Sequence, residues 1–168
     1  DSNEFDAIIA QKGLMHFRIQ IFGKKAHGAY NWLGVNAIEI AARVIGKLKN
    51  LKFQYKKHPL LHGPTMNIGV MKGGDKVNMV CDFCEFALDT RYPPGMNPDF
   101  ILKTIEKVVA SETKNFKVVI DDWQLPYEIN PNHPGVKLWV DVSKKHGAKA
   151  TIKGSEGATV ITFFKKHG

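Results

Sequence analysis

A single histidine with glycines around it is the first group in this sequence that could do chemistry. His27 stands in the segment FGKKAHGAYNWLG, with Gly23, Gly28 and Gly34 nearby. An imidazole titrates near neutral pH and can donate or accept a hydrogen bond, and a loop that only connects two elements needs neither property. The alternative is an exposed histidine in a loop that contacts no ligand. His27 is therefore a candidate ligand-contacting residue, provided that the flanking elements hold its loop.

Two cysteines, Cys81 and Cys84, form a CxxC pair that could serve metal or redox chemistry. A structural zinc site needs two further ligands at matched spacing, and the chain has no second CxxC pair. The pair lies in a strand-like run, where residues i and i+3 point to opposite faces. We expect two packed thiols in a reducing compartment rather than a metal site.

The period of the apolar residues predicts the elements around these groups. Residues 14–22 alternate apolar and polar side chains, which is typical of a half-buried strand. From Asn36 onward the apolar residues recur every three or four positions, which predicts a helix over 36–49 with Asn36 as its N-cap. Further elements follow in order: strands at 65–71 and 76–91 around a KGGDK turn, a helix that starts at Asn97 and Pro98, and a strand at 116–121. The order β-α-β-β-α-β predicts an α+β fold, a ferredoxin-like two-layer sandwich.

The segment after Trp123 has a different texture. A turn-rich linker with three prolines leads to a predicted helix at 135–146, a short strand at 148–153 and a helix at 158–166. A segment of this size cannot bury its own apolar faces, so we expect it to need a partner segment. The chain starts without methionine and stops as a helix ends, and we expect both ends to be cuts through a longer chain.

The net charge of +8, from 24 basic and 16 acidic residues, raises the question of an acidic partner. The basic residues are scattered, which is typical of a solvated surface. One alternative is a ferredoxin-like nucleic-acid-binding module, but the strand sequences NIGVM and CDFCEFALD lack the aromatic pattern of RNA readers. No apolar run approaches the roughly 20 residues that span a bilayer. We therefore expect neither nucleic acid nor a membrane as partner.

Three segments, in order, resemble one family: the di-zinc metallopeptidases and amidohydrolases that include acetylornithine deacetylase, succinyl-diaminopimelate desuccinylase and glutamate carboxypeptidase. The segments are QKGLMHFRIQIFGKKAHGAYNWLGVNAIEIAA, TMNIGVMKGGDKVNMVCDFCEFALDTR and KGSEGATVITFFKKHG. They are similar to the family's AHx loop with its following GxNAI, to its strand pair that closes in DxR, and to a later Gly-Ser/Thr-Asp/Glu turn. The resemblance implies that residues 10–123 are the lid, or dimerisation, domain. Residues 1–9 would end one catalytic-domain segment, and residues 124–168 would start the next.

The resemblance also implies roles for three residues of the lid. His27 would reach across a homodimer, which is joined through an edge strand and the neighbouring helix, into the partner's active site. There it would bind the oxyanion that forms when an amide carbonyl is attacked. Asn78 would orient the amide part of the substrate, and the Arg91 fork would bind a substrate carboxylate. Arg91 could instead pair with Asp89.

Outside the lid, the resemblance implies that Asp1 is a carboxylate ligand to one of two zinc ions, and that Ser155 and Glu156 line the substrate pocket. The whole protein would be a cytoplasmic enzyme that hydrolyses an amide of an N-acyl amino acid or small peptide. The family's other metal ligands and its general-base glutamate have no counterpart in this chain. The chain alone is therefore expected to be inactive and to bind zinc poorly. Cys81 also departs from the family, which often has proline there.

A chain of this kind could be a stand-alone dimerisation module with no catalytic role, which is the second alternative to the hydrolase. The histidines other than His27 are given no functional role. His16 is expected on the polar face of its strand, and five are expected at the solvated surface: His58, His62, His133, His146 and His167.

Overall fold

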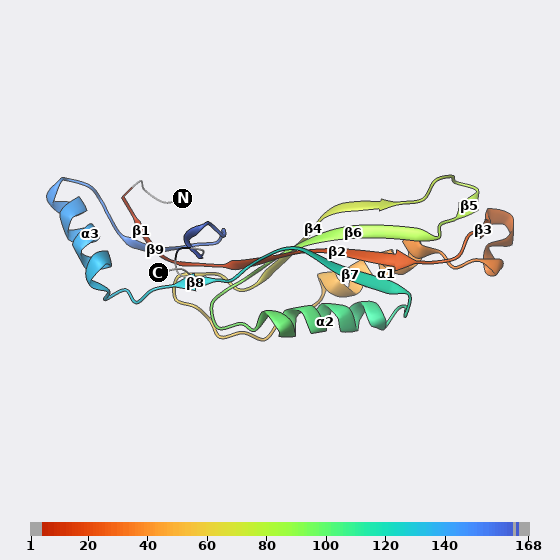
Figure 1. Ribbon diagram of the computed structural model, residues 1–168, viewed down its shortest axis with the longest axis horizontal. Coiled ribbons are helices and arrows are strands. Elements are labelled where there is room, and N and C mark those ends of the chain that lie inside the picture. Colours follow the sequence, from red (N-terminus) through yellow and green to blue (C-terminus); the bar gives the residue numbers. More distant parts are fainter. Residues whose placement is uncertain (1–4, 163, 165–168) are drawn as a thin grey trace.

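The computed structural model describes residues 5–162 and residue 164, and it shows an elongated molecule in which a long sheet and a small sheet lie end to end (Figure 1). The strands are β1 (Ala7–Gln11), β2 (Gly13–Phe22), β3 (Ala26–His27), β4 (Thr65–Gly73), β5 (Met79–Val80), β6 (Phe83–Tyr92), β7 (Phe116–Gln124), β8 (Tyr127–Glu128) and β9 (Ile152–Ser155). The helices are η1 (Gly28–Leu33), a 3-10 helix, and α1 (Ala37–Lys49), α2 (Pro98–Ala110) and α3 (Pro134–Lys145).

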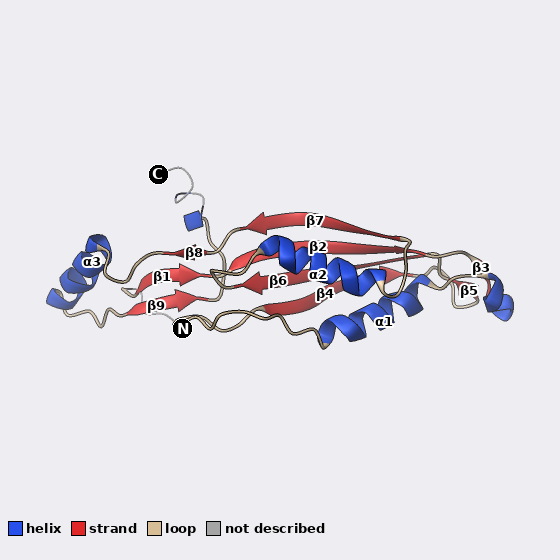
Figure 2. Ribbon diagram, turned by 90° about the horizontal axis from the view of Figure 1, so that it is seen from below, coloured by secondary structure: helices blue, strands red, loops and turns tan. Residues whose placement is uncertain are grey.

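The long sheet has four strands in the order β4-β6-β2-β7, and every neighbouring pair is antiparallel. Helices α1 and α2 both cover one face of this sheet (Figure 2). The β2-α1-β4-β6-α2-β7 order with this strand arrangement is the ferredoxin-like sandwich, so the predicted α+β fold class is confirmed.

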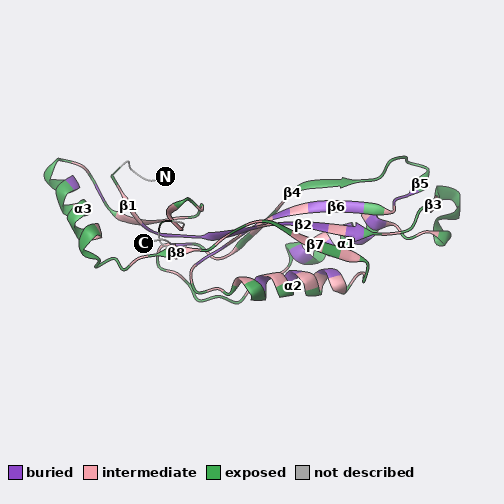
Figure 3. Ribbon diagram, viewed as in Figure 1, coloured by how far each residue is buried: buried purple, intermediate pink, exposed green. Residues whose placement is uncertain are grey.

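The core lies between the long sheet and its two helices. Strand β2 buries alternate side chains, and this burial explains the alternation of apolar and polar residues in its sequence. The buried strand residues of the core are Met15, Phe17, Ile19, Ile21, Cys84, Phe86, Leu88 and Tyr92, and the helices add Ala37, Ile40, Ala41, Val44, Leu48, Ile101, Ile105 and Val109. Burial is concentrated in the middle of the molecule, and both ends are largely exposed (Figure 3).

Both helices on the sheet begin at the asparagines that the sequence predicts. The Asn36 side-chain oxygen accepts a hydrogen bond from the Ile38 N–H at 3.0 Å, and its amide nitrogen donates to Glu39 at 3.1 Å. Asn97 accepts from the Asp99 N–H in the same way, with Pro98 in the first turn. Each cap satisfies a backbone donor that has no partner within its helix.

We expect Asn36→Ala to lower the free energy of unfolding by about 1 kcal/mol, because the first turn of α1 loses its side-chain acceptor. Urea unfolding followed by circular dichroism measures this loss. Asn132→Ala is the matched control, since this exposed asparagine uses its backbone N–H, bonded to Asn130, rather than a helix-capping side chain. Equal losses of unfolding free energy in the two variants would contradict the capping role of the Asn36 side chain.

The strand predicted over 76–91 is wrong in one respect, because the structure divides it into β5 and β6. The carbonyls of Cys81 and Asp82, at the break, accept hydrogen bonds from the Ala37 and Gly23 N–H groups at 2.8 and 2.7 Å. Those bonds draw the backbone out of the sheet, and the sequence pattern carries no sign of them.

The same break changes the geometry of the two cysteines. Cys81 and Cys84 do not point to opposite faces, because both are buried in one core cluster. They are free thiols, as the sequence predicts. Burial, together with Cys81, raises the pKa of the Cys84 thiol, which makes it a poor nucleophile.

The small sheet forms the other end of the molecule. Strand β1 pairs in parallel with β9 and antiparallel with β8, so an early and a late segment of the described chain are neighbours there. Helix α3 confirms the predicted helix of the tail, and the predicted strand lies slightly later, at β9. Of the last helix, predicted over 158–166, residues 158–160 are coil or turn, residues 161, 162 and 164 are helical, and residues 163, 165 and 166 lie outside the described part. Leu138, Trp139 and Val142 of α3 are between 44% and 65% exposed, in agreement with a segment that does not bury its own apolar face.

Within residues 5–162 and 164, the structure has no helix that is both long and apolar enough to cross a membrane.

Candidate functional site

The loop of His27 lies at the tip of the molecule farthest from the small sheet (Figure 1). Strands β3 and β5 pair there, with His27 opposite Met79. Next to this pair, the Gly28 N–H donates to the Asn78 carbonyl at 2.8 Å. The fold therefore brings two of the sequence-predicted site residues, His27 and Asn78, together on one exposed surface.

The His27 ring is held by its own helix. Residue His27 is the N-cap of η1, and its Nδ1 accepts a hydrogen bond from the Ala29 N–H at 3.1 Å. An imidazole nitrogen that accepts carries no proton, so the neutral ring has its proton on Nε2. Across the described part of the chain, Nε2 has no hydrogen-bond partner. His27 therefore presents a fixed, outward N–H donor.

The base of the His27 loop is closed by backbone contacts, which explains one of its glycines. Lys24 and Val35 exchange two N–H···O bonds of 2.9 Å across the loop. A Cβ atom at Gly23 would lie 2.1 Å from the Val35 carbonyl oxygen, so a side chain at this position would push the two arms apart. The glycine thus serves close backbone approach, and this approach sets the direction in which the tip points.

Two exposed aromatic rings of the donor's own helix lie next to one another, and one of them contacts His27. The rings of His27 and Tyr30 are 6.1 Å apart, and Tyr30 contacts Trp32 edge to face at 5.6 Å. Tyr30 is 56% exposed and Trp32 is 71% exposed. The tip therefore combines one polar donor with an apolar surface, a composition that suits contact with another molecule.

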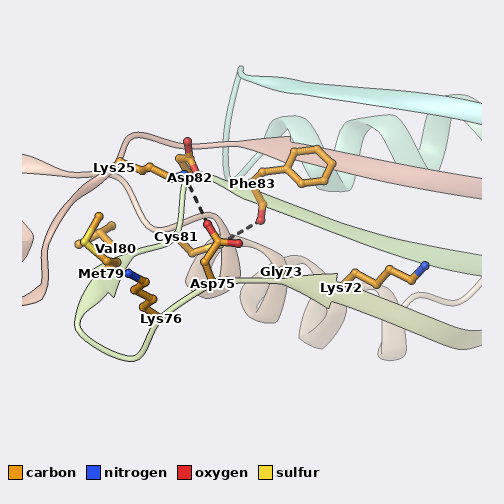
Figure 4. Close-up of a pocket in the computed structure, with 11 residues that line it drawn as sticks. Lys25, Lys72, Gly73, Asp75, Lys76, Met79, Val80, Cys81, Asp82 and Phe83 are labelled. Carbon is orange, nitrogen blue, oxygen red and sulfur yellow. Dashed lines mark hydrogen bonds and ion pairs between the residues drawn. The ribbon is translucent and has the colours of Figure 1, made fainter.

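A hollow of about 600 Å³ lies behind the tip, between the 72–83 segment and the loop residue Lys25 (Figure 4). Lys25 faces Asp82 and Asp75 at 3.6 and 3.4 Å, and Lys72 points away from them. The Asp82 carboxylate, followed by Asp75, raises the pKa of the Lys25 ammonium. Because its cations are dispersed or neutralised by these carboxylates, the hollow offers no convergent charge for a ligand, and it does not include His27 or Asn78.

Arg91 lies away from the tip, on the face of the long sheet opposite the helices. Its Nε and one terminal nitrogen donate to the two Asp89 oxygens at 2.6 and 2.9 Å. His16, on the adjacent strand, lies 3.6 Å from the same carboxylate. The fork that could bind a substrate carboxylate is held by Asp89 in this structure, so the substrate role of Arg91 stays a prediction.

Ser155 and Glu156 lie at the opposite end of the molecule from His27. Glu156 pairs with the Lys12 ammonium at 2.5 Å and accepts the His62 N–H at 2.9 Å. Burial tends to raise the pKa of Glu156, but the hydrogen bonds from Lys12 and from the backbone and ring of His62 outweigh it and lower the pKa below its ordinary value. Glu156 is therefore an anion bound within the chain, and its predicted place in a substrate pocket is untested.

Asp1, the predicted zinc ligand, lies outside the described residues. Among residues 5–162 and 164, no group of three or more histidine, cysteine, aspartate or glutamate side chains could hold a metal ion. The described side chains thus do not fit a metal centre by themselves.

The predicted surface location is confirmed for His62, whose side chain is 91% exposed, and for His133 and His146. It is wrong for His58, because the His58 side chain is only 8% exposed and bonds Glu128 at 3.0 Å. His16 is partly exposed, at 41%, and His167 lies outside the described residues. The pairing of His58 with Glu128 depends on contacts 70 residues apart, which no local pattern in the sequence shows.

The comparisons with known proteins identify relatives for both the long sheet and the whole chain. The family model described as a peptidase dimerisation domain, of the M20 type, matches residues 9–117. The structure is similar to aminopeptidase PepT from Bacillus cereus, with a TM-score of 0.81 and 22% identity over 100% of this chain and 44% of that one. A tripeptidase from Staphylococcus aureus gives a TM-score of 0.79 and 22% identity, with the same coverage of both chains. An M20 family metallo-carboxypeptidase from Sulfolobus solfataricus gives a TM-score of 0.76 and 17% identity over 95% of this chain and 56% of that one. The chain thus spans less than half of the first two relatives.

Proposed function

This chain belongs to the M20 peptidase dimerisation-domain family, and from that premise we propose that it is the lid of a homodimeric, metal-dependent amide hydrolase. The whole protein would hydrolyse an N-acyl amino acid or small peptide in the cytoplasm, a location that suits two buried free thiols. Residues 10–123 would form the lid, and residues 1–9 and 124–168 would belong to the catalytic half.

The observation that carries this proposal is the distance between the two ends of the molecule. The small sheet, which would adjoin the catalytic half, lies at one end, and His27 lies at the other (Figure 1). A rigid lid of this shape keeps His27 away from the catalytic half of its own subunit. His27 would therefore serve the partner's active site.

The chemistry proposed for His27 follows from its hydrogen bonding. With Nδ1 occupied by the Ala29 N–H, the Nε2–H is fixed as a donor. In the partner's site this donor would bind the carbonyl oxygen of the scissile amide. The bond strengthens as negative charge develops on that oxygen, so it favours the transition state over the substrate. Asn78, on the same surface, would orient the amide group.

The metal of this hydrolase would be held elsewhere than in the described residues, which contain no suitable cluster. Two zinc ions, with Asp1 as one ligand, remain the proposal for the whole protein. When bound, such ions activate water for attack on the amide. Arg91, Ser155 and Glu156 would contact substrate only if their present partners release them. The chain by itself is proposed to be inactive.

The dimer is proposed to form through β4 and α1. Strand β4 is a sheet edge with one charged residue, Lys72, whereas the opposite edge, β7, carries Lys117, Asp121 and Asp122. Charged side chains protect an edge from pairing, so β4 is the less protected of the two. A groove of about 300 Å³ runs between β4 and α1, and most of its lining is apolar: Ile45, Leu48, Leu51, Met66 and Ile68.

We expect this chain to sediment as a dimer, at twice its 18.8 kDa mass, and Val70→Lys to sediment as a monomer. Val70 is 50% exposed near the middle of β4, where a two-fold axis would bring the two new charges close together. Ile120→Lys, on the other edge strand and 40% exposed, is the matched control and should stay dimeric. A monomeric wild type, or a dimer lost in the Ile120 variant alone, would refute this interface.

A further inference from the structure

The connection between α1 and β4 does more than join two elements. Residues 51–64 contain no helix or strand, and residues 58–63, here called the strap, lie against the small sheet rather than the long one. His58 bonds Glu128 of β8 at 3.0 Å through Nε2, while its Nδ1 accepts the Leu60 N–H at 3.1 Å. The strap belongs to a connection within the long-sheet unit, but it is anchored to β8, a strand of the small sheet.

The contact of the strap with β9 is equally close. A Cβ atom at Gly154 would lie 2.4 Å from the Leu60 carbonyl oxygen and 2.7 Å from the Leu61 side chain. Leu61 itself is only 6% exposed. The strap backbone therefore sits directly on β9, at a position where only glycine leaves room for it.

A buried lysine closes the arrangement. Lys12 lies between β1 and β2, where the chain passes from the small sheet to the long one, and its side chain is 1% exposed. Its ammonium donates to the Gly63 carbonyl at 2.6 Å and pairs with Glu156 at 2.5 Å. Glu156 in turn accepts the His62 N–H. A buried charge is costly unless it is paired and hydrogen-bonded, so these contacts depend on one another.

The need for a third attachment follows from the topology. The chain passes between the two sheets at only two places in the described residues, Lys12 and the two residues between β7 and β8. Two single-chain connectors allow rotation about the line through them. An attachment off that line removes this rotation, and the strap is such an attachment.

We infer that the strap, locked by the Lys12–Glu156 pair, fixes the angle between the small sheet and the long sheet. Lys12 and Glu156 are then positioning residues rather than substrate contacts. The inference about the angle stands on the contacts within this chain. Its consequence for catalysis, which is the place that the His27 tip reaches, rests on the proposed function.

Spin labels on the two ends test the angle directly. Lys107→Cys on α2 and Lys137→Cys on α3 are exposed label sites, in a background where Cys81→Ser and Cys84→Ala remove the native thiols. Mixed with an excess of unlabelled protein, so that each dimer carries at most one labelled subunit, the labelled protein is expected to give one narrow distance distribution. Glu156→Ala should lose the narrow peak, because the Lys12 ammonium loses its carboxylate partner and the His62 N–H loses its acceptor. Hydrogen exchange should show loss of protection at the His62 amide in the same variant.

Glu112→Ala is the matched control, since this carboxylate also binds two cations, Lys47 and Arg43, but within the long-sheet unit alone. It should keep the narrow peak. If Glu156→Ala keeps the peak while folded, or if Glu112→Ala broadens it equally, the inference is wrong.

Should Glu156→Ala fail to fold, Lys12→Met gives the answer, because an apolar side chain of similar length tolerates the buried position. Broadening there supports the strap, and an unchanged peak refutes it. Dimer formation, measured separately, is independent of this result.

Discussion

In the proposed full-length hydrolase, His27→Ala is expected to lower kcat by about 10²- to 10³-fold, the usual cost of removing one donor to a developing oxyanion. The alanine cannot replace the Nε2–H that the Ala29 contact fixes in place. KM should change much less than kcat, because the bond forms mainly in the transition state. Metal content should be unchanged, since His27 is proposed to bind the substrate oxygen and not the metal. Steady-state kinetics and metal analysis on the same preparations measure these effects.

His133→Ala is the matched control for this variant. His133 is exposed, and its Nδ1 accepts the Gly135 N–H at 3.2 Å, so it caps α3 as His27 caps η1. Both variants lose a cap of the same kind, but only the loss of His27 should lower kcat. A fall of similar size in both variants would mean that the kinetic effect is structural.

Mixed dimers separate action on the partner from action within one subunit. Subunits with His27→Ala keep a working catalytic half, and subunits inactivated in the catalytic half keep His27. If His27 serves the partner, mixing the two inactive proteins restores activity, because each hybrid contains one complete site. If His27 serves its own subunit, no hybrid has a complete site and mixing restores nothing.

The fold of the long sheet could be predicted because its signals are local. Alternation over β2 and the helical period after Asn36 depend on neighbours within a few residues, and the structure confirms both. The break between β5 and β6 could not be predicted. It depends on the Gly23 and Ala37 N–H groups, which reach Asp82 and Cys81 from a distant part of the chain.

The candidate site shows the same division. His27 stood out because a histidine among glycines is unusual in a simple connection, and the structure places it with Asn78 on an exposed tip. Lys12 gave no such signal. A lysine between two strands is expected to be solvated, and only its long-range partners Gly63 and Glu156 explain its burial.

Phe17→Ala is expected to lower the free energy of unfolding by about 3–5 kcal/mol, the usual range for a fully buried phenylalanine. Phe17 is 0% exposed, at the middle of β2, which pairs with β6 on one side and β7 on the other. Because a domain is stable by only about 5–15 kcal/mol, this one change removes a large share of the total. Urea unfolding measures the loss as a lower midpoint with an unchanged slope.

Phe22→Ala, at the end of the same strand, is the matched control. Phe22 is 42% exposed and contacts one other ring, that of Phe83 at 5.6 Å, so its loss should cost no more than about 1.5 kcal/mol. Similar losses at the two positions would show that the core does not lie where the structure places it. The difference also bears on function, because β2 is the continuous strand that leads from Lys12 toward Gly23. A weakened β2 would loosen the strand that connects Lys12, which binds the strap, with the tip that carries His27.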